Sequence, residues 1–357
     1  MPLLGPARRR EQILTLVSTR GSAKLADLAV ELGAAAVTIR RDVEALAQQG
    51  RVTRRYGVVL PASRAREAAA PGTVVAIASS LSGYMQEILR GAQQAVTEAG
   101  GRYVLDVAPN ARAAHRSLER AAATAGVTGL LFAPKWQSMD EVNDDLGLVL
   151  APRVPMVLLE RFAPRGSLLA AHDAVRSDHA SGVHQALSHL RAHGHQRVLL
   201  FSRDDSPTAR TLRACFAEAQ RSLGMPVLSG PLLSCDGADQ HHRAHAPDPI
   251  EAVRRCGATA LLVHSDTDAL ALLPQFEAAG VSVPRDLSVV SWDDVVAGLG
   301  EVPLTTVAPP KQEVGAAAVE LLRWRCANPA APARRLEVAT HLVERSSVRA
   351  IDDRAPH

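Results

Sequence analysis

The feature that most limits what this chain can fold into is a long alternation of apolar, strand-like segments with helix-like segments, starting at Thr73. Strands are predicted at residues 73–78, 103–107, 129–133, 156–159, 198–202, 260–263 and 287–291. Helices are predicted between them, including residues 85–99, 177–192, 211–223 and 268–279. Apolar strands that alternate with helices are typical of parallel sheets covered on both faces. We therefore predict an α/β fold for this part of the chain.

Polar and aromatic residues follow several of these strands directly. They are Ser79–Tyr84, Lys135-Trp136, Glu160-Arg161, Ser265-Asp266 and Trp292-Asp293-Asp294. Parallel sheets bind ligands outside the carboxyl ends of their strands. Aromatic rings stack on the C–H faces of sugars, and planar charged groups form hydrogen bonds with their hydroxyls. Each residue alone has an ordinary surface or capping role as an equal alternative, but their shared position favours a sugar site.

The N-terminal segment differs from the rest in charge. Residues 1–66 carry twelve Arg or Lys and five Asp or Glu, whereas the remaining residues carry 28 basic and 32 acidic side chains. A basic head on a mildly acidic body indicates a polyanionic partner for the head alone. On charge alone, a merely solvated basic face is the alternative.

Three short helical patterns and a hairpin pattern make up the head. The helices are predicted at residues 8–18, 25–32 and 36–49, and a β-rich run broken by Gly57 follows them. This order is typical of a helix-turn-helix with a two-stranded wing. On the third helix we expect an inner side formed by Val37, Ile39, Val43 and Leu46.

The third helix and the wing supply the predicted DNA contacts. Thr38, Arg40 and Arg41 lie in the first turns of the helix, which in such motifs enter the major groove. Arg51, Arg54 and Arg55 on the wing would lie along the phosphate backbone. The alternative is that Arg40 and Arg41 only solubilise the helix and pair with Asp42 and Glu44.

The head also resembles a known family. Its string "TIRRD" at residues 38–42, followed by Gly50 and Arg54 at the proper distance, resembles the N-terminal DNA-binding domain of DeoR-type bacterial regulators. Two departures matter. Ala35 replaces the usual capping serine, so a cap worth roughly 1 kcal/mol is missing. Tyr56-Gly57-Val58 replaces His-Gly-Gly at the wing tip.

The body is similar to the ligand-binding domain of lac- and gal-repressor-type regulators, which is related to periplasmic sugar-binding proteins. Seven strings in the right order carry this resemblance: "SGYMQEILRGAQQAVTEAGG", "VTGLLFAP", "VPMVLLER", "SDHASGVHQALSHLRAHGHQRVLLF", "ATALLVHSDTDALALLPQFEAAGVSVPRDLSVVSWDD", "VPLTTVAPPKQEVGAAAVELL" and "HLVERSS". The resemblance implies two Rossmann-like lobes joined by three crossovers, a sugar in the cleft between them, and a dimer formed along the lobes.

The resemblance also assigns effector-binding residues. Tyr84 matches an aromatic that stacks on the sugar, and Asp293 matches a carboxylate that accepts bonds from its hydroxyls. Arg161 matches an arginine near the cleft, with Glu160 in place of the usual Asp. Ser265 replaces a ligand-contacting asparagine. The family's cleft arginine falls at Leu212 here, with Arg213 one residue away and Arg210 two, and Arg213 is the expected equivalent. Trp136 joins this set because it follows a predicted strand.

These observations define the expected domains. Residues 1–60 form a winged helix-turn-helix, 61–72 a linker rich in Pro, Ala and Arg, 73–348 an effector-binding and dimerisation domain, and 349–357 a tail. The N-terminus lacks the apolar core of a signal peptide, and nowhere do about 18 apolar residues follow one another. We therefore expect a cytoplasmic protein without a membrane contact.

No recognisable catalytic string is present. Phosphate-binding, nucleophile-elbow and zincin patterns are missing, so we expect no catalytic residue and no cofactor. His241, His242 and His245 have metal-like spacing but lie in a loop-like segment, so we expect no metal.

The sequence thus predicts a ligand-responsive transcription regulator. We expect it to repress carbohydrate-metabolism genes as a homodimer that binds double-stranded operator DNA and a sugar or sugar derivative. The alternative is a sugar-phosphate enzyme fused to a DNA-binding head, because DeoR-type heads are usually joined to a domain of that kind.

Overall fold

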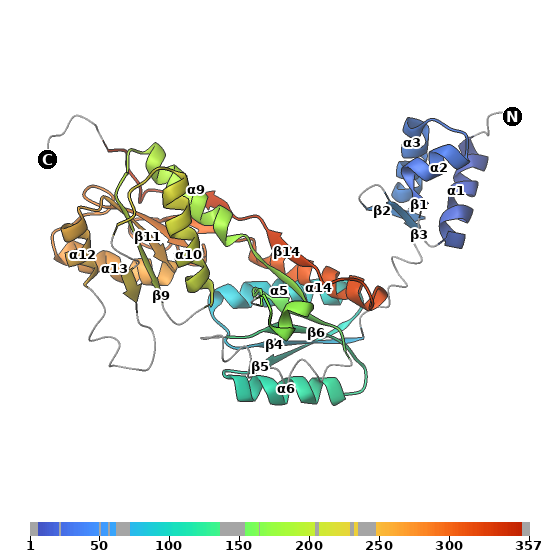
Figure 1. Cartoon of the computed structure of the whole chain (residues 1–357), viewed down its shortest axis with the longest axis horizontal. Helices are drawn as coiled ribbons and strands as arrows, with labels where there is room; N and C mark the ends of the chain where they lie inside the picture. Colours follow the sequence, from blue (N-terminus) through green and yellow to red (C-terminus); the bar gives the residue numbers. More distant parts are fainter. Residues whose placement is uncertain are drawn as a thin grey trace. The chain divides into compact units, whose positions relative to one another are not determined.

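The computed structural model describes residues 6–20, 23–49, 51–55, 58–61, 72–135, 154–163, 165–203, 207–228, 232–234 and 248–351. The chain divides into two compact units, Met1–Gly72 and Thr73–His357. Each unit is drawn in Figure 1 and is described by itself below. Among the described residues, no helix combines the length and the apolar character needed to cross a bilayer.

The first unit is a three-helix bundle with a small sheet (Figure 1). Its elements are α1 (Pro6–Arg20), β1 (Ala23–Lys24), α2 (Leu25–Glu31), α3 (Ala36–Gln48), β2 (Val52–Arg55) and β3 (Val58–Pro61). The sheet is antiparallel with the order β1-β3-β2. The core combines Ile13, Val17, Leu28, Ile39, Val43, Leu46, Val52 and Val59. The predicted helix-turn-helix with a wing is therefore confirmed.

A buried carboxylate holds the first and third helices together. Asp42 on α3 is 3% exposed and accepts hydrogen bonds from Arg9 at 2.6 Å and from Arg10 at 2.8 Å, both on α1. Burying a charge is tolerable only when it is paired, and two guanidinium groups meet that condition here. Two of the twelve basic residues in the head are thus structural.

One predicted core residue of the head is wrong. Val37 was expected on the inner side of α3, but its side chain is 59% exposed. The buried stripe of this helix runs through Ile39, Val43 and Leu46 at intervals of four and three residues. Val37 precedes Ile39 by two positions, or about 200° around the helix, which places it on the opposite side.

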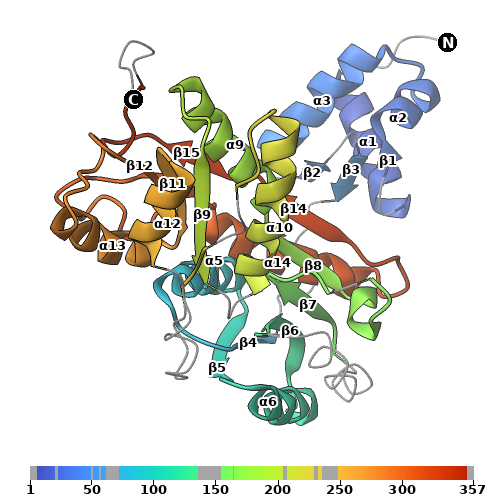
Figure 2. The same cartoon turned by 60° about the vertical axis from the view of Figure 1, so that its left-hand side comes forward.

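The second unit has two lobes, each built on a six-stranded sheet (Figure 2). The sheet of the first lobe has the order β14-β8-β7-β6-β4-β5 with every pair parallel. Its strands are β4 (Thr73–Ala78), β5 (Arg102–Val107), β6 (Val127–Ala133), β7 (Met156–Leu159), β8 (Asp173–Ser177) and β14 (Arg335–Val338). One face packs on α5 (Gly83–Glu98) and α14 (Lys311–Ala327). The other face packs on α6 (Ala111–Ala123) and the short 3-10 helix η1 (Leu168–Ala171).

The sheet of the second lobe has the order β10-β9-β11-β12-β13-β15, and β15 pairs antiparallel with β13. Its strands are β9 (Val198–Arg203), β10 (Leu232–Ser234), β11 (Ala260–His264), β12 (Ser288–Trp292), β13 (Thr305–Ala308) and β15 (His341–Val343). One face packs on α9 (His179–Ala192) and α10 (Pro207–Ser222). The other packs on α12 (Pro249–Cys256) and α13 (Asp266–Ala278).

The chain passes between the lobes three times. It leaves β8 of the first lobe for α9 of the second, returns from β13 to α14, and goes from β14 back to β15. All three passages follow the carboxyl ends of strands. Ligands of parallel sheets bind at these ends, so we expect a ligand site in the space between the two lobes.

Candidate functional site

The exposed face of α3 carries the predicted DNA contacts. Arg40 and Arg41 are exposed and form no ion pair within the described part of the chain, while Thr38 is half-buried. Asp42, one of the two acids considered as their partners, is occupied by Arg9 and Arg10. The two guanidinium groups therefore remain available to an external anion.

The wing carries the other three predicted DNA contacts. Arg51 is exposed directly before β2, and Arg54 and Arg55 lie on β2 with side chains outside the described ones. At the start of α3, Ala35 makes no side-chain cap hydrogen bond, as its lack of a polar side chain predicts.

In the second unit, a cleft of about 640 Å³ is lined by residues from both lobes. Four of the predicted effector residues line it: Tyr84, Arg161, Ser265 and Asp293. They come from segments that are far apart in the sequence, namely the start of α5, the end of β7, the start of α13 and the end of β12. The cleft also receives Lys135 and Asp266, which the sequence placed among the polar residues at strand ends, and Thr208, which it did not predict.

Of the two other predicted effector residues, one is absent from the lining of this cleft and one lies outside the described residues. Arg213, on α10, is absent from its lining, and its guanidinium lies 3.5 Å from the Ser202 hydroxyl at the end of β9. Trp136 lies outside the described residues, as do the three histidines considered as metal ligands. No cluster of three or more His, Cys, Asp or Glu suited to a metal occurs among the residues that the structure describes.

Glu160 and Asp293 occupy corresponding positions in the two lobes. Each follows the strand at the same place in its sheet, β7 or β12, and each donates its backbone N–H to the next strand, to Val175 or Val307. Both have a positive φ, 58° for Glu160 and 101° for Asp293, which is rare for residues other than glycine. Such strain costs on the order of 1–3 kcal/mol and is concentrated at ligand sites.

In the first lobe, Glu160 is a buried acceptor for the cleft tyrosine. The Tyr84 hydroxyl donates to its Oε1 at 2.5 Å, and the Ser177 N–H donates to its Oε2 at 2.9 Å. Burial, reinforced by the charge of Glu160, raises the pKa of the Tyr84 hydroxyl well above its usual value. The Tyr84 hydroxyl therefore stays protonated, and its hydrogen bond to Glu160 holds that end of the ring in place.

In the second lobe, Asp293 is a half-buried carboxyl with an unusual charge state. Burial, together with the nearby charge of Asp266, raises its pKa to about 8, although Lys311 acts in the opposite direction. Asp293 is therefore largely protonated at neutral pH, so it can both donate and accept a hydrogen bond. The adjacent Asp294 instead pairs with Arg345 at 2.7 Å.

Asp266 is the anchor of the turn that presents Asp293. Its Oδ1 accepts from the hydroxyls of Ser291 and Thr306, and its Oδ2 accepts from the N–H groups of Val295 at 2.6 Å and Val296 at 3.2 Å. Four donors satisfy this buried carboxylate, so its role is structural as much as ligand-facing.

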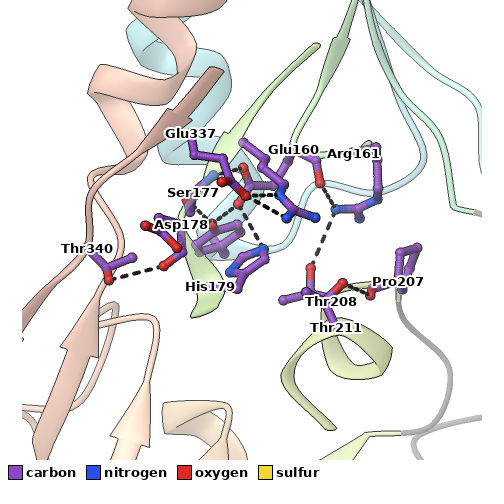
Figure 3. A network of polar contacts seen from close by, with 12 residues as sticks. Glu160, Arg161, Ser177, Asp178, His179, Pro207, Thr208, Thr211, Glu337 and Thr340 are labelled. Atoms are coloured by element: carbon purple, nitrogen blue, oxygen red, sulfur yellow. Dashed lines mark hydrogen bonds and ion pairs between the residues drawn. The ribbon is translucent and has the colours of Figure 1, made fainter. Parts of the chain in front are cut away.

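Arg161 reaches across the cleft. Its guanidinium donates to the backbone carbonyls of Pro134 at 3.0 Å and Glu160 at 2.7 Å. It also lies 3.5 Å from the hydroxyl of Thr208 on α10 of the other lobe (Figure 3). These contacts fix the plane of the guanidinium in the lining of the cleft.

The first crossover carries a buried histidine close to the same network. His179 opens α9, and its Nε2 lies 3.7 Å from Glu160 Oε1 (Figure 3). Its ring centroid is 6.1 Å from that of Trp292 in the second lobe. Burial lowers the pKa of His179, so its ring is neutral near pH 7. His179, two residues beyond the end of β8, thus lies between Glu160 and the core of the other lobe.

Comparisons with known proteins agree with this architecture. A family model described as a DeoR-like helix-turn-helix domain matches residues 9–64. A second, described as a periplasmic binding protein-like domain, matches residues 187–348. The chain thus contains one segment similar to each of these two domain families.

Curated relatives match most of the chain. The chain is 27% identical over 277 residues to an HTH-type transcriptional repressor, PurR, of Photobacterium profundum, which covers 76% of this chain and 80% of that protein. It is 28% identical over 264 residues to the arabinose metabolism transcriptional repressor of Geobacillus stearothermophilus, covering 70% of this chain and 69% of the relative.

Solved structures show the same fold. The complex of the transcriptional regulator CelR with cellobiose matches 89% of this chain and 94% of its own, with a TM-score of 0.64 and 24% identity. The lac repressor dimer bound to operator matches 78% of this chain and 94% of its own, with a TM-score of 0.64 and 20% identity. The two-lobed periplasmic-binding-protein architecture expected from the sequence is therefore confirmed.

Proposed function

We propose that this chain is a ligand-responsive transcription repressor of carbohydrate-metabolism genes. Its DeoR-like head binds operator DNA, and its two-lobed body binds a sugar or sugar derivative. The observation that carries the proposal is the cleft, where Tyr84, Arg161 and Asp293 converge from both lobes. An aromatic ring, a fixed guanidinium and a carboxyl that both donates and accepts match the C–H faces and hydroxyls of a sugar.

The names of the relatives support the same function. They are transcriptional repressors, including one of arabinose metabolism, and the related solved structures include complexes with ribose and with cellobiose. Because these relatives are regulators, a non-catalytic body is favoured over the sugar-phosphate enzyme considered from the sequence. With DNA as its partner, the proposed site of action is the cytoplasm.

The proposed DNA contacts are Thr38, Arg40, Arg41, Arg51, Arg54 and Arg55. The proposed effector contacts in the cleft are Tyr84, Arg161, Ser265 and Asp293. As a homodimer, the protein would present two heads to operator half-sites about one helical turn apart. The effector acts through a difference in its affinity for the DNA-competent and DNA-incompetent arrangements of the body.

Calorimetry tests the cleft. The full-length protein is titrated with a panel of neutral sugars, sugar acids and sugar phosphates, and the mixtures are then analysed for products. We expect one class of sugar to bind without being converted. Binding that survives unchanged in the Asp293→Ala variant, or conversion of the sugar, would contradict the proposal.

A further inference from the structure

The exposed face of α3, the helix that carries the proposed base contacts, has an apolar side chain between two charged side chains. Val37 is 59% exposed, and Arg40 and Arg41 follow it by three and four residues. On an α-helix this spacing places the three side chains side by side on one face. The opposite face holds the buried residues Ile39 and Val43, so the orientation of the helix in the head is fixed by its core.

An exposed valine beside two arginines has a limited choice of partners. A second apolar protein surface would have to cover the two guanidinium groups as well, at the cost of removing them from water. Duplex DNA suits all three groups together, because phosphates and guanine edges accept from arginine while thymine presents a methyl group in the major groove. That methyl group is an apolar feature which a valine can contact directly.

We propose that Val37 is a specificity-determining residue that selects thymine by contact with its C5-methyl group. The proposal rests on the DNA-binding function proposed above and adds a residue that neither the periodicity nor the family resemblance assigns to the DNA. Arg40 and Arg41 bind guanine or phosphate on either side of Val37. Cytosine lacks the methyl group, so a contact of this kind distinguishes the two pyrimidines.

The experiment first selects duplexes that the full-length protein binds from a random library. Each thymine of the selected site is then replaced singly by deoxyuridine, which removes the methyl group and leaves base pairing intact. We expect replacement at one thymine per half-site to weaken binding about fourfold, the effect of transferring one methyl-sized group out of water. Affinities that are unchanged at every position would overturn the proposal.

Two variants test whether Val37 causes the loss of affinity on deoxyuridine replacement. In Val37→Ala the deoxyuridine penalty at that position should largely disappear, because the isopropyl group that meets the methyl is gone. The control is Val30→Ala, the same change at a valine of α2 that is 84% exposed, for which the penalty should persist. A penalty equal in Val37→Ala and in the wild type would refute the assignment to Val37. If the library yields no bound duplex at all, the DNA-binding function itself fails.

Discussion

The Tyr84 hydroxyl donates a hydrogen bond of 2.5 Å to the buried Glu160 carboxylate, which joins the start of α5 to the end of β7. This relationship fixes an aromatic ring at the position where the fold binds ligands. Glu160 in turn holds Ser177 at the first crossover, so one carboxylate links the ring with the connection between the lobes.

Replacing Tyr84 by Phe should destabilise the protein by about 1–3 kcal/mol, because it leaves a buried carboxylate oxygen without this donor. The measurement is chemical denaturation of the full-length protein. Tyr103→Phe is the matched control, since the Tyr103 hydroxyl is buried with no hydrogen-bond partner in the described structure and its removal should cost little. Equal losses in the two variants would contradict the account of the Tyr84–Glu160 pair.

The raised pKa of Asp293 predicts how the stability of the protein changes with pH. Its pKa is about 8 in the folded protein and near 3.8 in the unfolded chain, so the folded state binds the proton more tightly. The contribution of Asp293 is therefore fully favourable below pH 4 and is lost as the pH rises toward 8, by about 1 kcal/mol per pH unit. Asp293→Asn should remove this slope.

The measurement is the free energy of unfolding of the wild type and Asp293→Asn at pH 6 and pH 8. The variant should gain stability relative to the wild type at the higher pH and lose its effector response. Asp294→Asn, which breaks the ion pair with Arg345, should lower stability at both pH values. A parallel pH profile for the wild type and Asp293→Asn would show that Asp293 is not protonated in the folded protein.

The exposed arginines of the head should separate into two kinds. Arg40→Ala should cost roughly 1–3 kcal/mol of operator binding and relax the preference at one base pair, because the residue lies on the recognition face. Arg51→Ala should weaken binding to all sequences alike and reduce the salt slope by about one. Fluorescence anisotropy at several salt concentrations measures both effects. Identical behaviour of the two variants would contradict the distinction.

Asp42 should be required for the head to stay folded. Asp42→Ala leaves Arg9 and Arg10 without their shared acceptor, and breaking a buried ion pair costs about 3–5 kcal/mol. Hydrogen exchange should therefore accelerate in α1 and α3 and remain unchanged in the second unit. Asp27→Asn, at an exposed position of α2, serves as the control and should leave exchange as in the wild type. Unchanged protection of α1 in Asp42→Ala would contradict the proposed role of this residue.

The sequence predicted the elements with strong apolar periodicity and missed those made of polar or very short segments. The bounds of β4 and β7 agree with the prediction to the residue, since both are continuous apolar runs. In contrast, β8 contains Asp173 and Arg176, and it becomes a strand because Arg325 of α14 neutralises the buried Asp173 at 2.6 Å. Such a partner, 152 residues away, leaves no local signal.

The candidate site was predictable to the extent that it follows from strand ends. The segments that hold Tyr84, Arg161, Ser265 and Asp293 were found because carboxyl ends of parallel strands meet in space, and the family resemblance indicated these residues within them. His179 was hidden inside a helical pattern, and Thr208 belongs to a helix that begins four residues earlier than its apolar periodicity indicated. The exposure of Val37 depends on which side of α3 the other helices cover. Apolar residues occur on both sides of this helix, so the sequence alone does not show which side is buried.

The most direct measurement of the central claim is the operator affinity of the full-length protein with and without the sugar that binds it, for the wild type and Asp293→Ala. The account predicts salt-sensitive DNA binding whose Kd changes at least about fivefold with the sugar in the wild type. In Asp293→Ala the DNA affinity should persist and the change should vanish. A variant that responds as the wild type does, or a wild type with no salt-sensitive affinity for any duplex, would contradict it.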